Sequence, residues 1–492
     1  MTHYDLIVVG AGFGGLAAAL TAAEQGARVL LLEALNYPGG CASTFRRSGY
    51  HFEAGATLFS GLGPGQLFDR WICRHGLAVE TEFLDPVVHF RTPEWILSVD
   101  RNRDAFFRSL AHLPRTDPKA VAALERAQRT VADVLWEILD HPGWLPPLEA
   151  KSVWAHVLRS PRYAELLPFV GRSLGSLLMR WSVAPDAALR TYLDALCQIT
   201  IQCRSDEAEA PFALGTMDYY FRGTGHVRGG IGRLAWGLVQ AIQQMGQTVR
   251  FAQRVRSVRR KDSGWEVRAR QERYWAPRVI FNLLPQDVQG LVHSGVDFSS
   301  WFDRTSNRVA ESWGAAMVYF AAKVPPGMGD EALHVELVQD AQQPLLEGNH
   351  LFCSISGAAD TGRAPEGERT VTVSTHVPMK RLQAAEEPGR YIQMIHDRMR
   401  RGLDVLLPEW WHRRTFEMTA SPRTFHRFTG RSHGFVGGIP RRVGLHHYRG
   451  LFPRPFAPGL FLVGDSVFPG QSTLATAIGG QRVAQAILRK AT

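Results

Sequence analysis

Cysteine is scarce in this sequence: the 492 residues include five, and none of them stands in a CxxC pair. Scattered cysteines of this kind favour neither a disulfide framework nor a zinc site, and they fit a reducing compartment. No other cluster of metal-ligating side chains stands out. We therefore expect a protein without a metal centre.

Long uncharged runs are almost as rare. The one stretch that could be mistaken for a membrane span covers residues 6–23, and it contains the glycine-rich segment GAGFGG. A membrane span needs about 20 apolar residues in one helix, whereas this stretch starts with the strand-like run LIVVG. Because Asp5 already opens this unit, no signal peptide is expected. The sequence predicts a cytoplasmic protein that does not cross a membrane.

Lysine is scarce as well, supplying six of the 56 basic residues, so the formal net charge of +10 comes mainly from arginine. Residues 398–458 hold twelve arginines against three acids. A basic surplus of this size suits nucleic acid, an anionic membrane surface or an acidic ligand. With 45% hydrophobic and 21% charged residues, the chain can form a large packed core, which excludes wholesale disorder.

The strongest signal lies in the first 33 residues. The run DLIVVG predicts a buried strand, GAGFGG supplies a GxGxxG pattern, LAAALTAAEQG predicts a helix, and ARVLLLE predicts a second strand ending in Glu33. In such a unit the first glycine makes the tight turn, the second lets a pyrophosphate approach, and the third packs helix against strand. The helix N-terminus attracts phosphates, and Glu33 accepts hydrogen bonds from a ribose diol. The predicted dinucleotide site contains Gly10, Gly12, Phe13, Gly14, Gly15, Glu33 and Ala34.

Further segments complete the same site. After Glu33, residues 36–45 bring a second glycine pair, which lets the backbone fold back under the dinucleotide. Near the other end of the chain, GLFLVGD predicts a strand ending in Asp465, followed by a small-residue helix with Ser472 or Thr473 as its N-cap. Midway, residues 229–246 predict a glycine turn and a helix.

These motifs resemble the FAD-dependent carotenoid desaturases and carotenoid isomerases of the flavin amine oxidase superfamily, over nearly the whole chain. The most specific stretches are residues 38–65, 421–431 and 464–480, of which the first is most like the carotenoid 3′,4′-desaturases. The resemblance implies an α/β fold, a Rossmann-like FAD-binding domain with an inserted α+β substrate domain. The FAD-binding domain is expected in residues 1–60, 225–290 and 445–492, and the membrane-facing substrate domain in residues 61–224 and 291–444.

The resemblance also implies FAD as the cofactor. It places Asp465 at the ribityl chain, the helix N-terminus after it at the pyrimidine end of the flavin, and Val255 at the adenine. The residues that it adds to the site are Gly40, Cys41, Ser43, Thr44, Val255, Gly464, Asp465, Thr473 and Leu474.

The implied reaction introduces a carbon–carbon double bond into a carotenoid, with hydride transfer from the polyene to flavin N5. Such chemistry needs few catalytic side chains, because the polyene spreads the developing charge and the flavin accepts the electrons. Glu53, His226 and His426 are candidates for a base, with a structural role as the alternative for each. Other functions stay open: a cis–trans isomerase or polyene saturase using reduced FAD, an amine oxidase, and a non-enzymatic prenyl-binding protein of the GDP-dissociation-inhibitor type.

An apolar substrate and a basic surplus together favour peripheral attachment to an anionic membrane surface. Three segments are candidates for the contact: a leucine-rich stretch at 166–181 that predicts one apolar helix face, the tryptophan and arginine cluster at 410–414, and the basic run at 398–458. A core helix and a solvated loop are the alternatives for the first two. Nucleic-acid binding is not expected, because no recognised module accompanies the charge.

Overall fold

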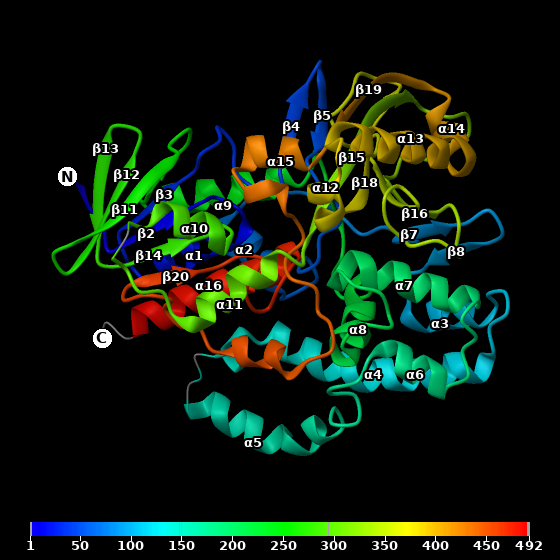
Figure 1. Ribbon diagram of the computed structural model, residues 1–492, viewed down its shortest axis with the longest axis horizontal. Helices are drawn as coiled ribbons and strands as arrows, with labels where there is room; N and C mark the ends of the chain where they lie inside the picture. Colours follow the sequence, from blue (N-terminus) through cyan, green and yellow to red (C-terminus); the bar gives the residue numbers. More distant parts are fainter. Residues whose placement is uncertain (1, 147, 149, 294, 490–492) are drawn as a thin grey trace.

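The computed structural model describes residues 2–146, 148, 150–293 and 295–489 (Figure 1). Its first layer is a five-stranded parallel sheet whose strands come from three separate stretches of the chain. In spatial order they are β10 (Thr248–Arg250), β3 (Val29–Leu32), β2 (Leu6–Val9), β14 (Val279–Phe281) and β20 (Leu460–Leu462). Strands β2, β3 and β14 are buried throughout, as their unbroken apolar runs predict for parallel strands covered on both faces.

Helices cover one face of this sheet. Leu6 and Val8 point into a core shared with α1 (Phe13–Glu24), α9 (Gly232–Gln244) and α16 (Thr473–Arg489). The axes of α1 and α16 can approach closely because a side chain at Gly480 would lie 2.0 Å from the carbonyl oxygen of Gly14. The two ends of the chain are thus packed together through glycine.

A smaller sheet and two helices cover the other face, on which Ile7 and Val9 lie. The sheet has the order β1 (Thr2–His3), β13 (Glu272–Ala276), β12 (Gly264–Ala269) and β11 (Val255–Lys261). Beside it lie α10 (Pro285–Leu291) and α11 (Ser300–Val309). Alternate residues of each parallel strand therefore enter two different cores.

A second, seven-stranded mixed sheet lies apart from the first (Figure 1). Its order is β19 (Arg414–Ala420), β15 (Trp313–Lys323), β18 (Glu368–Pro378), β17 (His350–Ile355), β16 (Leu333–Val338), β7 (Val88–Arg91) and β8 (Ile96–Val99). The apolar face of α13 (Pro388–Leu406), with α14 (Pro408–Trp411), packs on it. Both long insertions thus contribute strands to one sheet.

A helical layer completes the structure below the second sheet in the view of Figure 1. It contains α3 (Arg103–Ala111), α4 (Pro118–Asp140), α6 (Leu174–Arg180), α7 (Ala188–Ile201) and α8 (Ala210–Met217). Helix α5 (Ala150–Ala164) lies at the lower edge, beyond α4. The remaining elements are β4 (Thr44–Arg47), β5 (Tyr50–Glu53), β6 (Thr81–Glu82), β9 (His226–Val227), α2 (Leu67–His75), α12 (Met379–Ala384), α15 (Pro422–Thr429) and short 3₁₀ turns including η4 (Leu445–Leu451).

Two of the candidate membrane segments do not have that role, and for residues 166–181 the alternative of a core position holds. Residues 166–181 do not form one helix: turns precede α6, and its residues Leu174, Leu177 and Leu178 are buried in the helical core. Trp410 and Trp411 are buried against the seven-stranded sheet, not presented to a membrane. In both cases the apolar residues that suggested a surface contact serve the core instead. Within the described residues, no helix is long and apolar enough to span a bilayer.

Candidate functional site

A large cavity opens at the carboxyl ends of the parallel strands. It encloses about 1230 Å³ and continues between the helical layer and the seven-stranded sheet. At one end its walls are the turns that follow β2, β3, β14 and β20; at the other they include Trp144, Tyr163, Phe212 and Phe352. Ligands of open α/β sheets bind at this edge. The cavity continues from the glycine turns to the aromatic side chains between the helical layer and the seven-stranded sheet.

The first glycine turn forms the floor of the cavity. Gly10 has a φ of +98°, and Gly12 precedes α1 without any side-chain cap. The first N–H groups of any helix lack partners within the helix, and in α1 no side chain caps them. They face the cavity together with the positive end of the helix dipole. Asn282, at the end of β14, fills the space that a Cβ at Gly12 would need, since its Nδ2 atom would lie 2.5 Å away.

Glu33 sits beside this turn and is buried. Its carboxylate accepts hydrogen bonds from the N–H groups of Ala11 (2.7 Å) and Leu35 (2.8 Å). Burial raises the pKa of Glu33, and these backbone hydrogen bonds oppose the increase. The carboxylate is therefore fixed at the end of β3, in the place where the motif predicts a ribose contact.

The second glycine pair brings the following loop back over the first. The N–H of Gly39 donates to the carbonyl of Ala11 over 2.8 Å, and a Cβ at Gly40 would lie 3.6 Å from the Cα of Gly12. Cys41, next in the chain, lines the cavity, and burial raises the pKa of its thiol. The two glycine turns thus form one backbone surface, as the sequence predicts.

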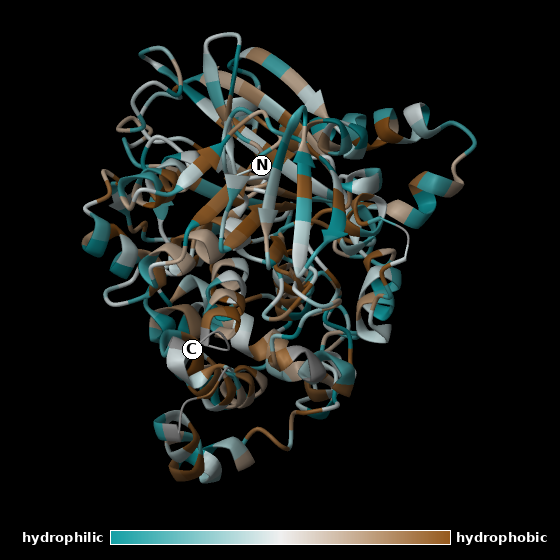
Figure 2. Cartoon of the chain, turned by 90° about the vertical axis from the view of Figure 1, so that its left-hand side faces the viewer, coloured by the Kyte–Doolittle hydropathy of each residue, from teal (hydrophilic) through white to brown (hydrophobic). Residues whose placement is uncertain are grey.

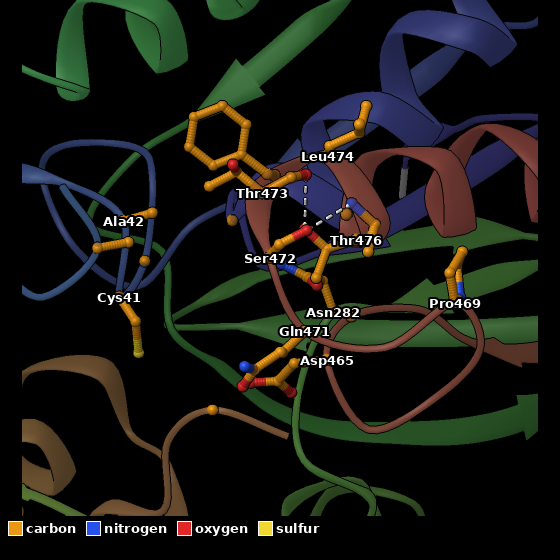
Figure 3. A pocket seen from close by; sticks show the side chains of 18 of the residues that line it. Cys41, Ala42, Asn282, Asp465, Pro469, Gln471, Ser472, Thr473, Leu474 and Thr476 are labelled. Carbon is orange, nitrogen blue, oxygen red and sulfur yellow. Dashed lines mark hydrogen bonds between the residues drawn. The ribbon is translucent and has the colours of Figure 1, made fainter. Parts of the chain in front are cut away.

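The carboxyl-terminal segment forms the facing wall (Figure 3). Asp465, after β20, accepts a hydrogen bond from Arg431 over 2.8 Å. The N–H of Ala475 donates to the side chain of Ser472, which is therefore the N-cap of α16, one of the two predicted caps. The N-terminus of a second helix, α16, thus also faces the cavity.

Several polar atoms at this end of the cavity lack partners. Among the described residues, the Oγ1 atom of Thr473 and the Oε1 atoms of Gln253 and Gln286 are buried without a hydrogen bond, and all three residues line the cavity. Buried polar atoms are normally satisfied, so three orphans in the lining of one cavity indicate a polar ligand. The N-termini of α1 and α16 and the glycine surface, which has no side chains, face the same cavity. These features and the orphaned polar atoms together fit a dinucleotide.

The cavity brings together most of the residues predicted from the motifs. Those that line it are Gly10, Gly12, Phe13, Gly14, Glu33, Ala34, Gly40, Cys41, Val255, Gly464, Asp465, Thr473 and Leu474. Three others support it from behind. Gly15 packs on the carbonyl of Gly10, Ser43 donates to the carbonyl of Gly40 (2.8 Å), and Thr44 donates to Glu53 (2.9 Å).

The predicted base candidates are not among the lining residues. Glu53 accepts hydrogen bonds from the N–H of Ile231 (3.0 Å) and from Arg363 (3.1 Å), and so ties β5 to two other segments. His426 lies on the exposed side of α15 and contacts the carbonyl of Arg431. Both side chains hold loops in the structure.

His226 is buried and pairs with Asp360, with 2.8 Å between Nε2 and Oδ2. Burial opposes ionisation of Asp360, yet the hydrogen bond and charge of His226 outweigh it and lower the pKa of Asp360 to about 2. The pair joins β9 to the loop after β17, behind the cavity wall. No group of three possible metal ligands occurs among the residues that the structure describes.

Sequence reasoning missed Asn282, Arg431 and Arg441. Asn282 comes directly after β14, where a parallel strand ends, and that position alone could have marked it. Arg431 lies in a stretch whose family likeness was visible, but its pairing with Asp465 spans 34 residues of sequence. Arg441 reaches the cavity from a loop with no motif, and no local signal singles it out.

The sequence is similar to several known proteins. Residues 8–71 match the family model of an NAD(P)-binding Rossmann-like domain. Prolycopene isomerase from Arabidopsis thaliana is 26% identical over 509 residues, covering 97% of this chain and 81% of that protein. Hydroxyneurosporene desaturase from Cereibacter sphaeroides is 26% identical over 516 residues, covering 98% and 97%. The chain is a homologue of the carotenoid isomerases and desaturases. The predicted relationship, and the prediction that the chain is an enzyme, are thereby confirmed.

The solved structures agree on the fold. Putrescine oxidase bound to putrescine superposes with a TM-score of 0.66 at 15% identity, covering 99% of each chain. At that identity the likeness concerns architecture alone. It confirms for this carotenoid isomerase and desaturase homologue the predicted α/β fold, a Rossmann-like domain of the flavin amine oxidase type with an inserted α+β part.

Proposed function

We propose that this homologue is an FAD-dependent oxidoreductase that introduces a double bond into a carotenoid. The observation that carries the proposal is one continuous cavity, polar at the glycine turns and apolar beyond them. We assign residues 1–60, 225–290 and 445–492 to cofactor binding, and residues 61–224 and 291–444 to the substrate. The two classes of wall meet near Cys41, Asp465 and Gln471 (Figure 3).

The glycine turns and helix N-termini would hold FAD. In this assignment Glu33 binds the adenosine ribose, the α1 N-terminus with Gly12 binds the pyrophosphate, and Asp465 binds the ribityl chain. Bound FAD would supply the acceptor for the two electrons of a hydride that leaves the polyene. The orphaned Thr473 Oγ1 and the α16 N-terminus would stabilise negative charge at that end of the cavity.

The remaining walls orient an apolar chain and exclude water. Leu139, Leu145 and Ile439 are among the aliphatic side chains that line them, together with aromatic rings from several elements. His376 also lines the chamber, but burial, with His350 nearby, lowers its pKa to about 3. It therefore stays neutral near pH 7 and places no charge against the ligand. An unsaturated hydrocarbon suits such walls better than a charged amine.

Within carotenoid chemistry we propose 3′,4′-desaturation as the first candidate, on the likeness of residues 38–65. A cis–trans isomerase that uses reduced FAD is the second, because the prolycopene isomerases match 97% of this chain. The same walls would serve either reaction, since both need a polyene held beside the cofactor in the absence of water.

Expression in a carotenoid-producing bacterium tests the proposal. For a desaturase we expect pigments whose absorption maxima shift to longer wavelength by one added double bond, together with a loss of two mass units. An isomerase would change the geometric isomers at constant mass, which would replace the first candidate by the second. Unchanged pigments, with flavin-loaded protein present in the cells, would contradict both.

We further propose that α5 attaches the enzyme peripherally to an anionic membrane. Its side chains His156 and Tyr163 line the cavity, while Val153, Trp154, Val157 and Leu158 are exposed on its other side. This helix stands at the bottom of the molecule, where Figure 2 shows hydrophobic residues. Exposed Lys151 and Arg172 lie on or near it, and Arg162, also exposed, pairs with Glu137. The helix thus combines an apolar face, positive charge and one wall of the cavity.

The basic run at 398–458 is less suited to this role, because several of its arginines already have acidic partners. Arg400 pairs with Asp397 and Glu417, and Arg442 pairs with Glu207 and Glu311. Ion pairs of this kind remove net charge from the surface. We therefore move the proposed membrane contact from this run to α5.

Replacing both Trp154 and Leu158 by glutamate is expected to abolish binding to vesicles of phosphatidylglycerol and phosphatidylcholine. The two side chains are 68% and 76% exposed, and burial of each in lipid contributes about 1.5–3 kcal/mol, or about tenfold or more in affinity. Co-sedimentation measures the loss. Ile96→Glu is the matched control, because Ile96 is 66% exposed on β8, away from α5. Vesicle binding by the double variant at the level of Ile96→Glu would exclude α5 as the contact.

A further inference from the structure

Arg441 is a cation in the wall of an otherwise apolar chamber. Its backbone N–H donates to the carbonyl of Ile201 over 3.0 Å, which fixes the residue beside the end of α7. Its guanidinium donates to the carbonyl of Pro469 (2.7 Å) and lies over the ring of Phe212, 5.4 Å from the centroid. These contacts hold the side chain in one place and use only part of its hydrogen-bonding capacity, since a guanidinium carries five N–H groups.

No acid neutralises this cation within the part of the chain that the structure describes. The guanidinium also contacts His447, with 3.3 Å between Nη1 of Arg441 and Nδ1 of the imidazole. The other ring nitrogen, Nε2, contacts the carbonyl of Arg442. Burial and the charge of Arg441 lower the pKa of His447 to about 3, so the imidazole is neutral. Burial, with the charge of Arg308, lowers the pKa of Arg441 itself to about 10, which still leaves it charged near pH 7.

A buried acid beside Arg441 in the backbone pairing has other partners for its carboxylate. Glu209 pairs through its backbone with Arg441, but its carboxylate accepts from the N–H of Gly171 (2.7 Å), the N–H of Gly444 (3.1 Å) and the hydroxyl of Tyr448 (3.0 Å). Its carboxylate makes no ion pair with the guanidinium in the part of the chain that the structure describes. A partly buried cation without a counter-charge is costly to a fold, which makes a ligand the natural source of its missing acceptor.

Other polar groups gather at the same place. The Oε1 atom of Gln202 is buried without a partner, and the side chain of Gln471 donates to the carbonyl of Ile199 over 2.8 Å. Both residues line the cavity, as does Thr200. The chamber thus has one polar end region at the end of α7, separate from Glu33 and the first glycine turn.

We propose that Arg441 binds an oxygen atom at the end of an otherwise apolar ligand, with the oxygen accepting a hydrogen bond from the guanidinium. The proposal rests on the proposed function, a polyene in this cavity, and adds that the polyene is oxygenated at one end. Cofactor phosphates are not the intended partner, because Phe212 and the α7 end belong to the proposed substrate walls. A hydroxyl, a carbonyl or a carboxylate oxygen would each supply the acceptor.

A series of retinoid probes with one polyene and different end groups tests this on the flavin-loaded enzyme. The probes are retinol, retinoic acid and the hydrocarbon axerophtene, which lacks the oxygen, and binding is measured by quenching of protein fluorescence. A hydrogen bond to a charged group corresponds to about a tenfold to a hundredfold difference in affinity. We expect wild-type enzyme to bind at least one oxygenated probe tighter than axerophtene by this factor; the preferred probe identifies a neutral or an anionic end group.

Arg441→Leu is expected to erase this preference while axerophtene binding stays within about twofold of wild type. Arg441→Lys, which keeps a charge but not the fork of donors, should retain part of the preference and guards against a folding defect in the leucine variant. Arg423→Leu is the matched control, because Arg423 is exposed and does not line the cavity.

The outcomes separate the two proposals. If wild-type enzyme binds all three probes equally, Arg441 does not read an end group, although the proposed polyene site survives. If it binds none of them, and none of the longer hydrocarbon carotenoids, the proposed function itself fails. A fall in flavin content in Arg441→Leu and Arg441→Lys, with the probe preference intact, would overturn the proposal by assigning Arg441 to the cofactor.

Discussion

Purified Gly12→Val protein is expected to be colourless, with its affinity for FAD reduced about a hundredfold or more. Gly12 has a φ of −72°, which any residue adopts, so the backbone tolerates the substitution. The clash is local: the new Cβ would lie 2.5 Å from Nδ2 of Asn282, a side chain that a Cβ at any of five glycines of the site would meet. Valine would displace Asn282 and cover the N–H groups of α1 that we assign to the pyrophosphate, each worth about 1.5–3 kcal/mol to a charged group.

The ratio of flavin to protein absorbance, followed by FAD titration of the apo form, measures this loss. Gly389→Val is the matched control, because a Cβ at Gly389 meets nothing within 4 Å and the residue is exposed in the first turn of α13. The thermal unfolding of the two apo variants should then be similar. Wild-type flavin content in Gly12→Val would mean that the cofactor does not lie over this turn.

The parts of the site that could be predicted from sequence are those whose residues lie close together in the chain. The run from β2 to Glu33 combines an apolar strand, three glycines and an acid within one βαβ unit, and each requirement acts between residues close in the chain. The same is true of β20, Asp465 and the Ser472 cap of α16. Local patterns therefore yielded the parallel sheet and the turns at its edge.

The remaining parts of the structure depend on which helices and strands, far apart in the sequence, pack against one another. The apolar residues Trp410 and Leu174 carry the same pattern whether they face lipid or core, and only the packing of α14 on β15 and of α6 on α8 decides between the two. Likewise β7 and β8 join a sheet whose other strands lie more than 200 residues later, a pairing that no window of sequence contains. Exposure of α5 became visible only once those neighbours were placed.

The second large effect is expected at the pair of Asp465 and Arg431. The oxygen Oδ2 and nitrogen Nη2 lie 2.8 Å apart, and the side chains are only 19% and 16% exposed. Desolvation works against the charge of Arg431, but Asp465 outweighs it and raises the pKa of the guanidinium. Removing one partner of a buried pair costs about 3–5 kcal/mol. With the remaining exposure, Asp465→Ala should lower the free energy of unfolding of the apo protein by about 3 kcal/mol.

The same carboxylate is assigned to the ribityl chain of FAD, so its removal should also weaken flavin binding, and a second substitution separates these two effects. In Asp465→Ala/Arg431→Met no unpaired buried charge remains, and a methionine can fill the space of the arginine stem. We expect chemical denaturation of the apo proteins to show that the double variant regains a large part of the lost stability, with a coupling of about 1–3 kcal/mol. FAD titration should show no matching recovery of affinity, because the carboxylate is still absent. Recovery of both quantities together would mean that Asp465 serves only to neutralise Arg431, and FAD retention at wild-type level in Asp465→Ala would remove this residue from the cofactor site.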